Sequence, residues 1–110
     1  MLWHGTRQTD PRTIVKTEHG LDMRFSAAGA YGNGIYFADN SAYSHNYAHP
    51  VPGMEKTYQM LFCFVLVGES FASPPNNQLK MPPMKPDSDQ RYDSITNPNN
   101  DHYIVYDNNK

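Results

Sequence analysis

Two tyrosines and one serine stand close together in the sequence, at spacings that place their side chains on neighbouring elements. They are Tyr36, Ser44 and Tyr47. Ser44 and Tyr47 are three positions apart, so on a helix they share one face. Tyr36 precedes that helix in a short apolar stretch. Two phenol rings and a hydroxyl that point toward one place predict a slot for a flat ring with polar edges.

The segment that contains these residues also contains the signals needed to position them. It opens with a glycine-punctuated turn over Gly32–Gly34, which suits positive φ or a close approach of a ligand to the backbone. An apolar strand follows over Ile35–Ala38. Asp39 and Asn40 then supply N-cap acceptors for a short helix over Ser41–Tyr47. The slot is therefore predicted between a strand and the helix that follows it.

Three separated blocks extend this pattern over the chain. They read LWHGTR at 2–7, YGNGIYFADNSAYSHNY at 31–47 and YIVYD at 103–107. Together, and in this order, they resemble the catalytic domain of the poly(ADP-ribose) polymerase family of ADP-ribosyltransferases. The segment QMLFCFVLVGESF at 59–71 is most similar to the tankyrase branch. The resemblance depends on the joint occurrence of the blocks because a lone His-Gly or GxG is common by chance.

The resemblance implies that NAD is the co-substrate, and it gives five residues a role. Gly5 offers its backbone N–H and C=O, and Ser44 its hydroxyl, to the carboxamide of nicotinamide. Tyr47 stacks on one face of the ring and Tyr36 lies against the other. His4 hydrogen-bonds the ribose on the adenine side. These groups suit the ligand because a carboxamide needs both a donor and an acceptor, and aromatic faces attract a cationic pyridinium.

Two more residues are implied as contacts of the NAD donor. Thr6 is a polar neighbour of His4, and Arg24 belongs to the loop over 21–34 that matches the lining of the donor site. There Arg24 meets the pyrophosphate, since guanidinium groups pair well with phosphate oxygens. On the same resemblance the catalytic positions are His4, Tyr36 and His102.

Each of these residues also has a purely structural interpretation. His4 fits an ordinary polar residue at a strand end, and Tyr36 fits plain core packing. Ser44 and Tyr47 fit a solvated helix face with an aromatic stripe. The spacing of His45 and His49 would suit metal ligands on a helix, but no cysteine pair or other third ligand lies nearby in the sequence. We therefore expect a nicotinamide pocket and no metal site.

Position 102 departs from the family pattern. In polymer-forming members the residue just before the YIVYD-like strand is a glutamate, which completes a trio with a histidine and a tyrosine. Here that place holds His102, preceded by Asp101. A neutral imidazole accepts a hydrogen bond but has no fixed negative charge. A one-residue slip that brought Asp101 into place would turn the side chains of the next strand to the wrong face, so we reject it.

Composition limits the class of protein. The chain has 110 residues, 38% of them hydrophobic, and a net charge of −2, which offers no electrostatic argument for nucleic-acid binding. The longest apolar run, Leu61–Val67, is too short to span a bilayer, so no membrane partner is expected. The single cysteine, Cys63, lies in that run and is interpreted as a buried, inert thiol. With no disulfide possible within the chain, an intracellular protein, nuclear or cytoplasmic, is expected.

The remaining elements follow from apolar patterns and helix caps. We expect the following: a strand over Leu2–His4, a helix over Pro11–His19 capped by Asp10, a loop over Leu21–Gly29, a doubly buried strand over Thr57–Val67, a proline-rich excursion over Ala72–Asp101 with a short strand at Tyr92–Thr96, and a strand over Tyr103–Tyr106. Dominant strands and few short helices give an α+β class with a mostly antiparallel sheet pair.

The resemblance implies a split antiparallel β-sandwich of the ADP-ribosyltransferase type. It also implies that residues 1–110 are part of a single catalytic domain whose flanking strands are missing at both ends, within a longer chain that has further domains. The expected function is mono-ADP-ribosyl transfer from NAD to acceptor proteins. Two alternatives stay open, a pseudoenzyme that binds or scaffolds and, because position 102 lacks a glutamate, the less favoured synthesis of poly(ADP-ribose).

Overall fold

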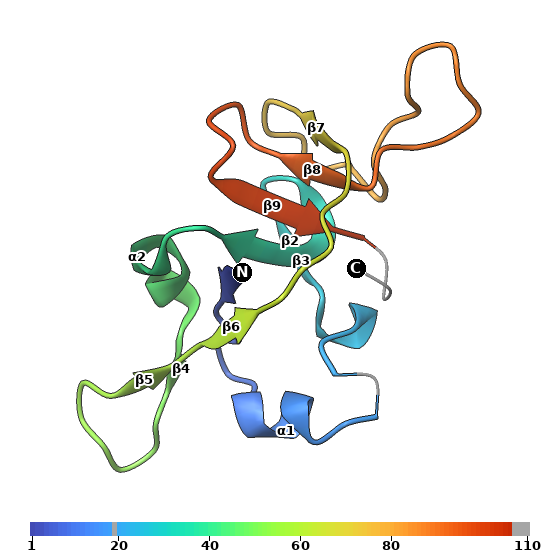
Figure 1. The fold of residues 1–110 in the computed structure, drawn as a ribbon. Helices are drawn as coiled ribbons and strands as arrows, with labels where there is room; N and C mark the ends of the chain where they lie inside the picture. The colour runs from blue at the N-terminus through green and yellow to red at the C-terminus, as the bar shows by residue number, and fades with distance from the viewer. Residues whose placement is uncertain (19, 107–110) are drawn as a thin grey trace. The chain divides into compact units, whose positions relative to one another are not determined.

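The computed structural model of the protein describes residues 1–18 and 20–106 (Figure 1). The described residues form two compact units. The first unit comprises residues from 1 to 21 and from 37 to 65, and the second comprises 22 to 36 and the described residues from 66 onward. None of the described helices is both long and apolar enough to cross a membrane.

Three short strands build the sheet of the first unit. β1 (Leu2–His4) pairs antiparallel with β6 (Leu61–Cys63), and Trp3 stands opposite Phe62. On its other side β1 pairs with the end of β3 (Gly32–Ala38), where Trp3 faces Ala38. A separate two-stranded ribbon joins β4 (His49–Pro50) to β5 (Tyr58–Gln59). β1 is thus the central strand of this sheet. Gly5 and the residues after it therefore begin at the middle strand and not at an edge.

The helices of the first unit are one turn or little more, and side-chain caps start two of them. α1 (Pro11–Val15) begins at Asp10, whose carboxylate accepts a hydrogen bond from the backbone N–H of Arg12. Hydrogen bonds from Arg12 lower the pKa of Asp10 to about 2. α2 (Ser41–Ser44) is capped by Asn40 and continues directly into the 3-10 helix η2 (His45–Tyr47).

The second unit contains a hairpin and a mixed sheet. β2 (Ala27–Gly29) pairs with the first residues of β3, with Gly29 opposite Gly32, so that only two residues make the hairpin loop. β3 neighbours β9 (His102–Val105), which pairs antiparallel with β8 (Ser94–Thr96). β8 in turn pairs in parallel with β7 (Ser70–Ala72). Figure 1 shows β8 and β9 side by side, in orange and red.

Two isoleucines and two tyrosines fill the core of the second unit. Ile95 of β8 and Ile104 of β9 are fully buried and stand opposite each other in the sheet. Tyr31 packs on them, and Tyr106 donates a hydrogen bond of 2.5 Å to its carbonyl oxygen. Desolvation and neighbouring tyrosines raise the pKa of Tyr106 strongly. The phenol therefore stays neutral, and it ties the end of β9 to the start of β3.

The predicted class is confirmed, since short helices accompany strands that are mostly antiparallel. Three local predictions need correction. The helix predicted over Pro11–His19 ends at Val15, and its predicted last residue lies outside the described residues. The predicted loop over Leu21–Gly29 contains the 3-10 helix η1 (Met23–Phe25) and strand β2. The predicted turn at Gly32–Gly34 belongs to β3, because small residues there let β2 pair alongside.

The strand predicted over Thr57–Val67 to be buried on both faces was also wrong. Only β5 and β6 form there, and alternate side chains face solvent: Phe62 is 53%, Phe64 76% and Leu66 58% exposed. In the sequence, a continuous apolar run looks the same whether one face of the strand or both faces are buried. The ring of Phe62 packs on the ring of Trp3, at 4.4 Å between centroids.

Cys63 lies on the other face of β6, where it is partly buried and not fully buried as predicted; the prediction of an inert thiol is supported by its pKa. Burial raises its pKa to about 11. We expect maleimide to modify Cys63 at pH 8 about 100 times more slowly than an unfolded cysteine, because the thiolate is the reactive species. Peptide mass spectrometry of the native protein and of the same protein in urea measures the ratio. Equal rates in the two samples would contradict a desolvated thiol.

Candidate functional site

The residues predicted to bind NAD divide between the two units. His4, Gly5, Thr6, Ser44 and Tyr47 belong to the first unit, whereas Arg24, Tyr36 and His102 belong to the second. The first set is gathered by β1 and by the α2–η2 turn. In the second set, η1, β3 and β9 each contribute one residue. The structure thus brings together five of the predicted residues within one unit.

Gly5 is the point at which β1 meets the α2–η2 turn. A Cβ atom at this position would lie 2.5 Å from the carbonyl carbon and oxygen of Tyr47 and 2.7 Å from the carbonyl oxygen of Ser44. No real Cβ tolerates such contacts with backbone atoms, so the position requires glycine for the fold itself. The backbone of Gly5 is consequently packed beside the two side-chain positions predicted to hold nicotinamide.

Ser44 is buried, with 3% of its surface exposed, and its hydroxyl donates a hydrogen bond of 3.1 Å to the carbonyl oxygen of Trp3. A serine hydroxyl has one proton and two lone pairs. In this arrangement Ser44 is therefore an acceptor toward any ligand. To donate to a carboxamide oxygen, as the family resemblance implies, the hydroxyl must first rotate away from Trp3.

Tyr47 is half-buried and already has two partners. The ring of Tyr43 lies 5.7 Å away, centroid to centroid, with the planes tilted by 57°. The guanidinium carbon of Arg7 lies 4.5 Å from the centroid of the Tyr47 ring, a distance typical of a cation–π contact. Arg7 is a residue that the sequence interpretation missed, and no sequence signal would have revealed a contact across 40 positions.

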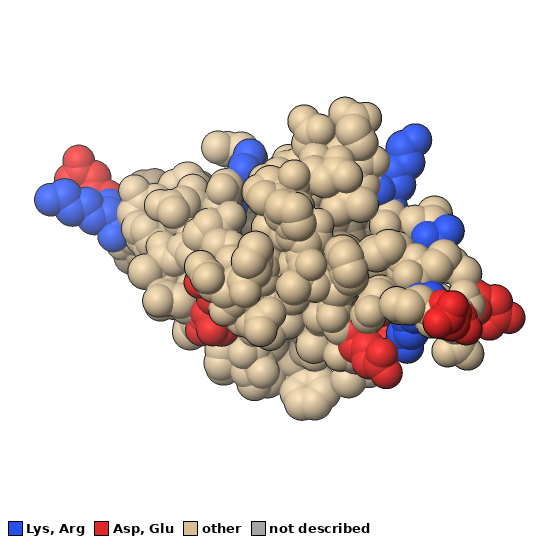
Figure 2. All heavy atoms as spheres, turned by 90° about the horizontal axis from the view of Figure 1, so that it is seen from above, with Lys and Arg blue, Asp and Glu red and all other residues tan. Residues whose placement is uncertain are grey.

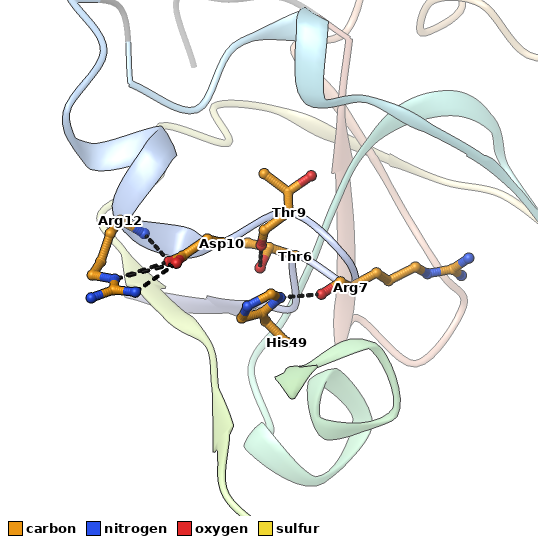
Figure 3. Close-up of polar contacts among 6 residues, drawn as sticks. All are labelled: Thr6, Arg7, Thr9, Asp10, Arg12 and His49. Carbon is orange, nitrogen blue, oxygen red and sulfur yellow. Dashed lines mark hydrogen bonds and ion pairs between the residues drawn. The ribbon is translucent and has the colours of Figure 1, made fainter. Parts of the chain in front are cut away.

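The backbone of Arg7 is fixed at both ends by the segment that follows η2. Its N–H donates to the carbonyl oxygen of Tyr47 at 2.7 Å, and its carbonyl oxygen accepts from Nδ1 of His49 at 2.7 Å (Figure 3). Arg7 has φ +52°, in the left-handed region that costs a non-glycine residue about 1 kcal/mol. His49, considered from the sequence only as a metal ligand, is buried and has this structural partner.

His4 and Thr6 flank Gly5, and both side chains are buried. The ring of His4 packs 5.3 Å from the ring of Phe37. The hydroxyl of Thr6 donates to the carbonyl oxygen of Thr9 at 2.6 Å and closes the turn that contains Arg7 (Figure 3). Thr6 therefore has a structural role in this turn, and its predicted contact with NAD stays a prediction.

Tyr36 holds the hairpin between β2 and β3. Its hydroxyl accepts from the N–H of Tyr31 at 2.9 Å and donates to the carbonyl oxygen of Gly32 at 2.5 Å. A Cβ at Gly29 would lie 2.8 Å from the Tyr36 ring, so glycine there makes room for the ring. The phenol oxygen is thereby anchored, and Tyr36 packs against the core of the second unit, so its predicted contact with NAD stays a prediction.

Arg24, the predicted pyrophosphate ligand, forms an ion pair with Asp22 at 2.8 Å. Asp22 is also the N-cap of η1, and its side chain is almost fully buried. The hydrogen bond to this carboxylate raises the pKa of Arg24. Because Asp22 already balances the guanidinium charge, Arg24 offers a phosphate less attraction than an unpaired arginine would.

His102 stands at the first position of β9, and an asparagine turn fixes its backbone. Oδ1 of Asn97 accepts the N–H groups of Asp101 and His102 at 2.9 and 3.0 Å, and Thr96 donates to the His102 carbonyl at 2.8 Å. Nε2 of His102 lies 3.8 Å from a carboxylate oxygen of Asp101. The place implied for a glutamate thus holds an imidazole beside a carboxylate.

Comparison with known proteins decides the family. The sequence profile of the poly(ADP-ribose) polymerase catalytic domain matches residues 1–75. A probable poly(ADP-ribose) polymerase of Dictyostelium discoideum is 38% identical over 104 residues, which cover 94% of this chain and 28% of the relative. The chain belongs to the poly(ADP-ribose) polymerase catalytic-domain family. It spans little more than a quarter of that relative.

Membership of the poly(ADP-ribose) polymerase family confirms the resemblance drawn from the three sequence blocks. The roles assigned to single residues stay predictions, since neither the profile match nor the relative tests them. The histidines weighed as metal ligands have separate neighbours: His45 packs 5.0 Å from the ring of Tyr58, and His49 bonds to Arg7. Over residues 1–18 and 20–106, no group of three His, Cys, Asp or Glu side chains is placed to hold a metal ion.

The turn before β9 generates a stability prediction. Replacing Asn97 with alanine removes the acceptor of two backbone N–H groups and should lower the free energy of unfolding by about 1–3 kcal/mol. Urea unfolding of the full-length protein, followed by a probe in this domain, measures the change. Asn99→Ala, an exposed position in the same turn, is the control and should leave stability unchanged. Equal stability of the two variants would show that the turn does not hold β9.

Proposed function

We propose that the protein is an NAD-dependent mono-ADP-ribosyltransferase. Family membership supports the reaction class, in which the nicotinamide glycosidic bond of NAD is cleaved and ADP-ribose passes to an acceptor. The main structural support is the packing of Gly5 on the backbone of Ser44 and Tyr47 within one compact unit. That packing gathers a backbone donor and acceptor, a hydroxyl and an aromatic face, the groups that a nicotinamide ring needs.

In the proposed reaction the electron pair of the glycosidic bond moves to the ring nitrogen, and nicotinamide leaves as a neutral molecule. Positive charge then develops on the ribose, and the acceptor attacks that carbon and loses its proton to solvent water. Gly5, Ser44 and Tyr47 hold the leaving ring so that ribose and acceptor meet in one geometry, which replaces an encounter in solution. Such a site depends more on positioning than on a strong base.

The choice of single-unit transfer comes from His102. Chain growth requires a group that polarises the hydroxyl of an ADP-ribose already attached, and a carboxylate does this by charge. An imidazole at the start of β9 cannot carry a negative charge of this kind, although the Asp101 carboxylate lies 3.8 Å from it. The same substitution favours the second candidate, a pseudoenzyme that binds NAD or ADP-ribose without turnover.

We propose protein side chains inside the cell as the acceptors. On the face drawn in Figure 2, lysine and arginine side chains form separate small groups and no continuous basic patch. The sequence as a whole has a net charge of −2. Both features disfavour a phosphate backbone as the acceptor, because nucleic-acid binding relies on clustered positive charge.

The pocket assignment is tested by ligand binding. Tyr47→Ala in the full-length protein should weaken binding of nicotinamide by about 1–3 kcal/mol, from lost stacking and an opened pocket. Isothermal titration calorimetry measures the change. Tyr58→Ala removes a half-exposed tyrosine from β5 and serves as the control. Unchanged affinity after Tyr47→Ala would remove Tyr47 from the pocket.

The mono-transfer assignment is tested by the size of the product. Wild type incubated with labelled NAD should attach single ADP-ribose units, seen on a denaturing gel as a sharp band without a ladder. His102→Glu should raise NAD turnover because it places a carboxylate at the first position of β9. Long chains from wild type would refute mono-transfer. A silent wild type beside an active His102→Glu variant would favour the pseudoenzyme.

A further inference from the structure

Arg7 has a position that the proposed reaction does not explain. It is the second residue after Gly5, its side chain is exposed, and its guanidinium lies 4.5 Å from the centre of the Tyr47 ring. If Tyr47 stacks on nicotinamide, one aromatic ring has to serve both a ligand and a cation of the protein. The guanidinium of Arg7 would then act on any ligand bound at Tyr47.

The placement of Arg7 is built into the fold. Its N–H and carbonyl oxygen are bonded to Tyr47 and His49, each at 2.7 Å, and the Thr6–Thr9 turn closes around it with a hydroxyl bond of 2.6 Å (Figure 3). Its φ of +52° is uncommon for a residue with a side chain. The guanidinium lies over the ring of Tyr47, the residue to which the Arg7 N–H is hydrogen-bonded.

Arg7 also differs from Arg12 in how its positive charge is balanced. Arg12 in the same unit forms an ion pair with Asp10 at 2.8 Å. Among the residues that the structure describes, no carboxylate lies within ion-pair distance of Arg7, and its guanidinium contacts the Tyr47 ring instead. A ring that stabilises one cation is a poor place for a second one nearby, since like charges repel through a partly desolvated site.

We propose that Arg7 is a specificity-determining residue which makes the Tyr47 site favour neutral nicotinamide over the cationic pyridinium of NAD. This inference rests on the proposed function. While NAD is intact, Arg7 and the pyridinium repel each other across the site. When the glycosidic bond breaks, its electron pair neutralises the ring nitrogen, the positive charge passes to the ribose, and the repulsion at Tyr47 ends. Arg7 thus favours departure of the leaving group.

The test compares two probes of nearly the same shape, neutral nicotinamide and cationic 1-methylnicotinamide. Calorimetry on the full-length protein gives both dissociation constants for wild type and for Arg7→Met, which keeps an unbranched side chain without the charge. We expect Arg7→Met to tighten binding of the cation about three- to tenfold relative to nicotinamide. Arg7→Lys should keep most of the wild-type preference. Lys16→Met, which removes an exposed cation from the same unit, should leave the ratio unchanged.

Kinetics supply an independent readout. Removing repulsion from the bound substrate should lower KM for NAD and lower kcat for nicotinamide release in Arg7→Met, whereas loss of simple packing would raise KM. An equal change in affinity for both probes would overturn the proposal and reduce Arg7 to a packing or blocking residue. If wild type binds neither probe, the proposed function itself fails, and this inference fails with it.

Discussion

The first unit depends on a single close contact, that of the Gly5 backbone with the carbonyl groups of Ser44 and Tyr47. Because no side chain fits between them, the end of β1 can lie directly on the α2–η2 turn. The hydrogen bond from Arg7 to Tyr47 and the bond from Ser44 to Trp3 close over the same contact from both sides. Chain segments about 40 positions apart are held together here by backbone packing, backbone hydrogen bonds and the side chains of Ser44, His49 and Tyr47.

In the second unit, tyrosine side chains hold chain segments together. Tyr36 and Tyr106 each bond through their hydroxyls to the hairpin loop at Tyr31 and Gly32, and Ile95 and Ile104 fill the space beneath. Their rings supply apolar surface while their hydroxyls satisfy loop backbone groups that would otherwise be left unpaired. The same two tyrosines therefore pack against the core and form hydrogen bonds with the backbone groups of the loop.

Two residues bear on the proposed reaction through electrostatics. An imidazole replaces a carboxylate at His102, next to Asp101, and a guanidinium covers part of Tyr47. In the proposed function His102 lacks the negative charge that chain growth requires, and in the further proposal Arg7 repels a cationic leaving ring.

The sequence alone determined the family, the α+β class and the local order of strand, cap and short helix around Tyr36 and Tyr47, because these depend on turn residues, caps and periodicity over a few neighbours. The sequence did not determine which side chains are buried. The run over Thr57–Val67 is apolar throughout, yet Phe64 is 76% exposed, since only tertiary neighbours decide which face is covered. The partners of Ser44, Arg7 and His49 were equally invisible, because each contact joins distant segments through backbone carbonyls or an aromatic ring, which leave no pattern in residue type.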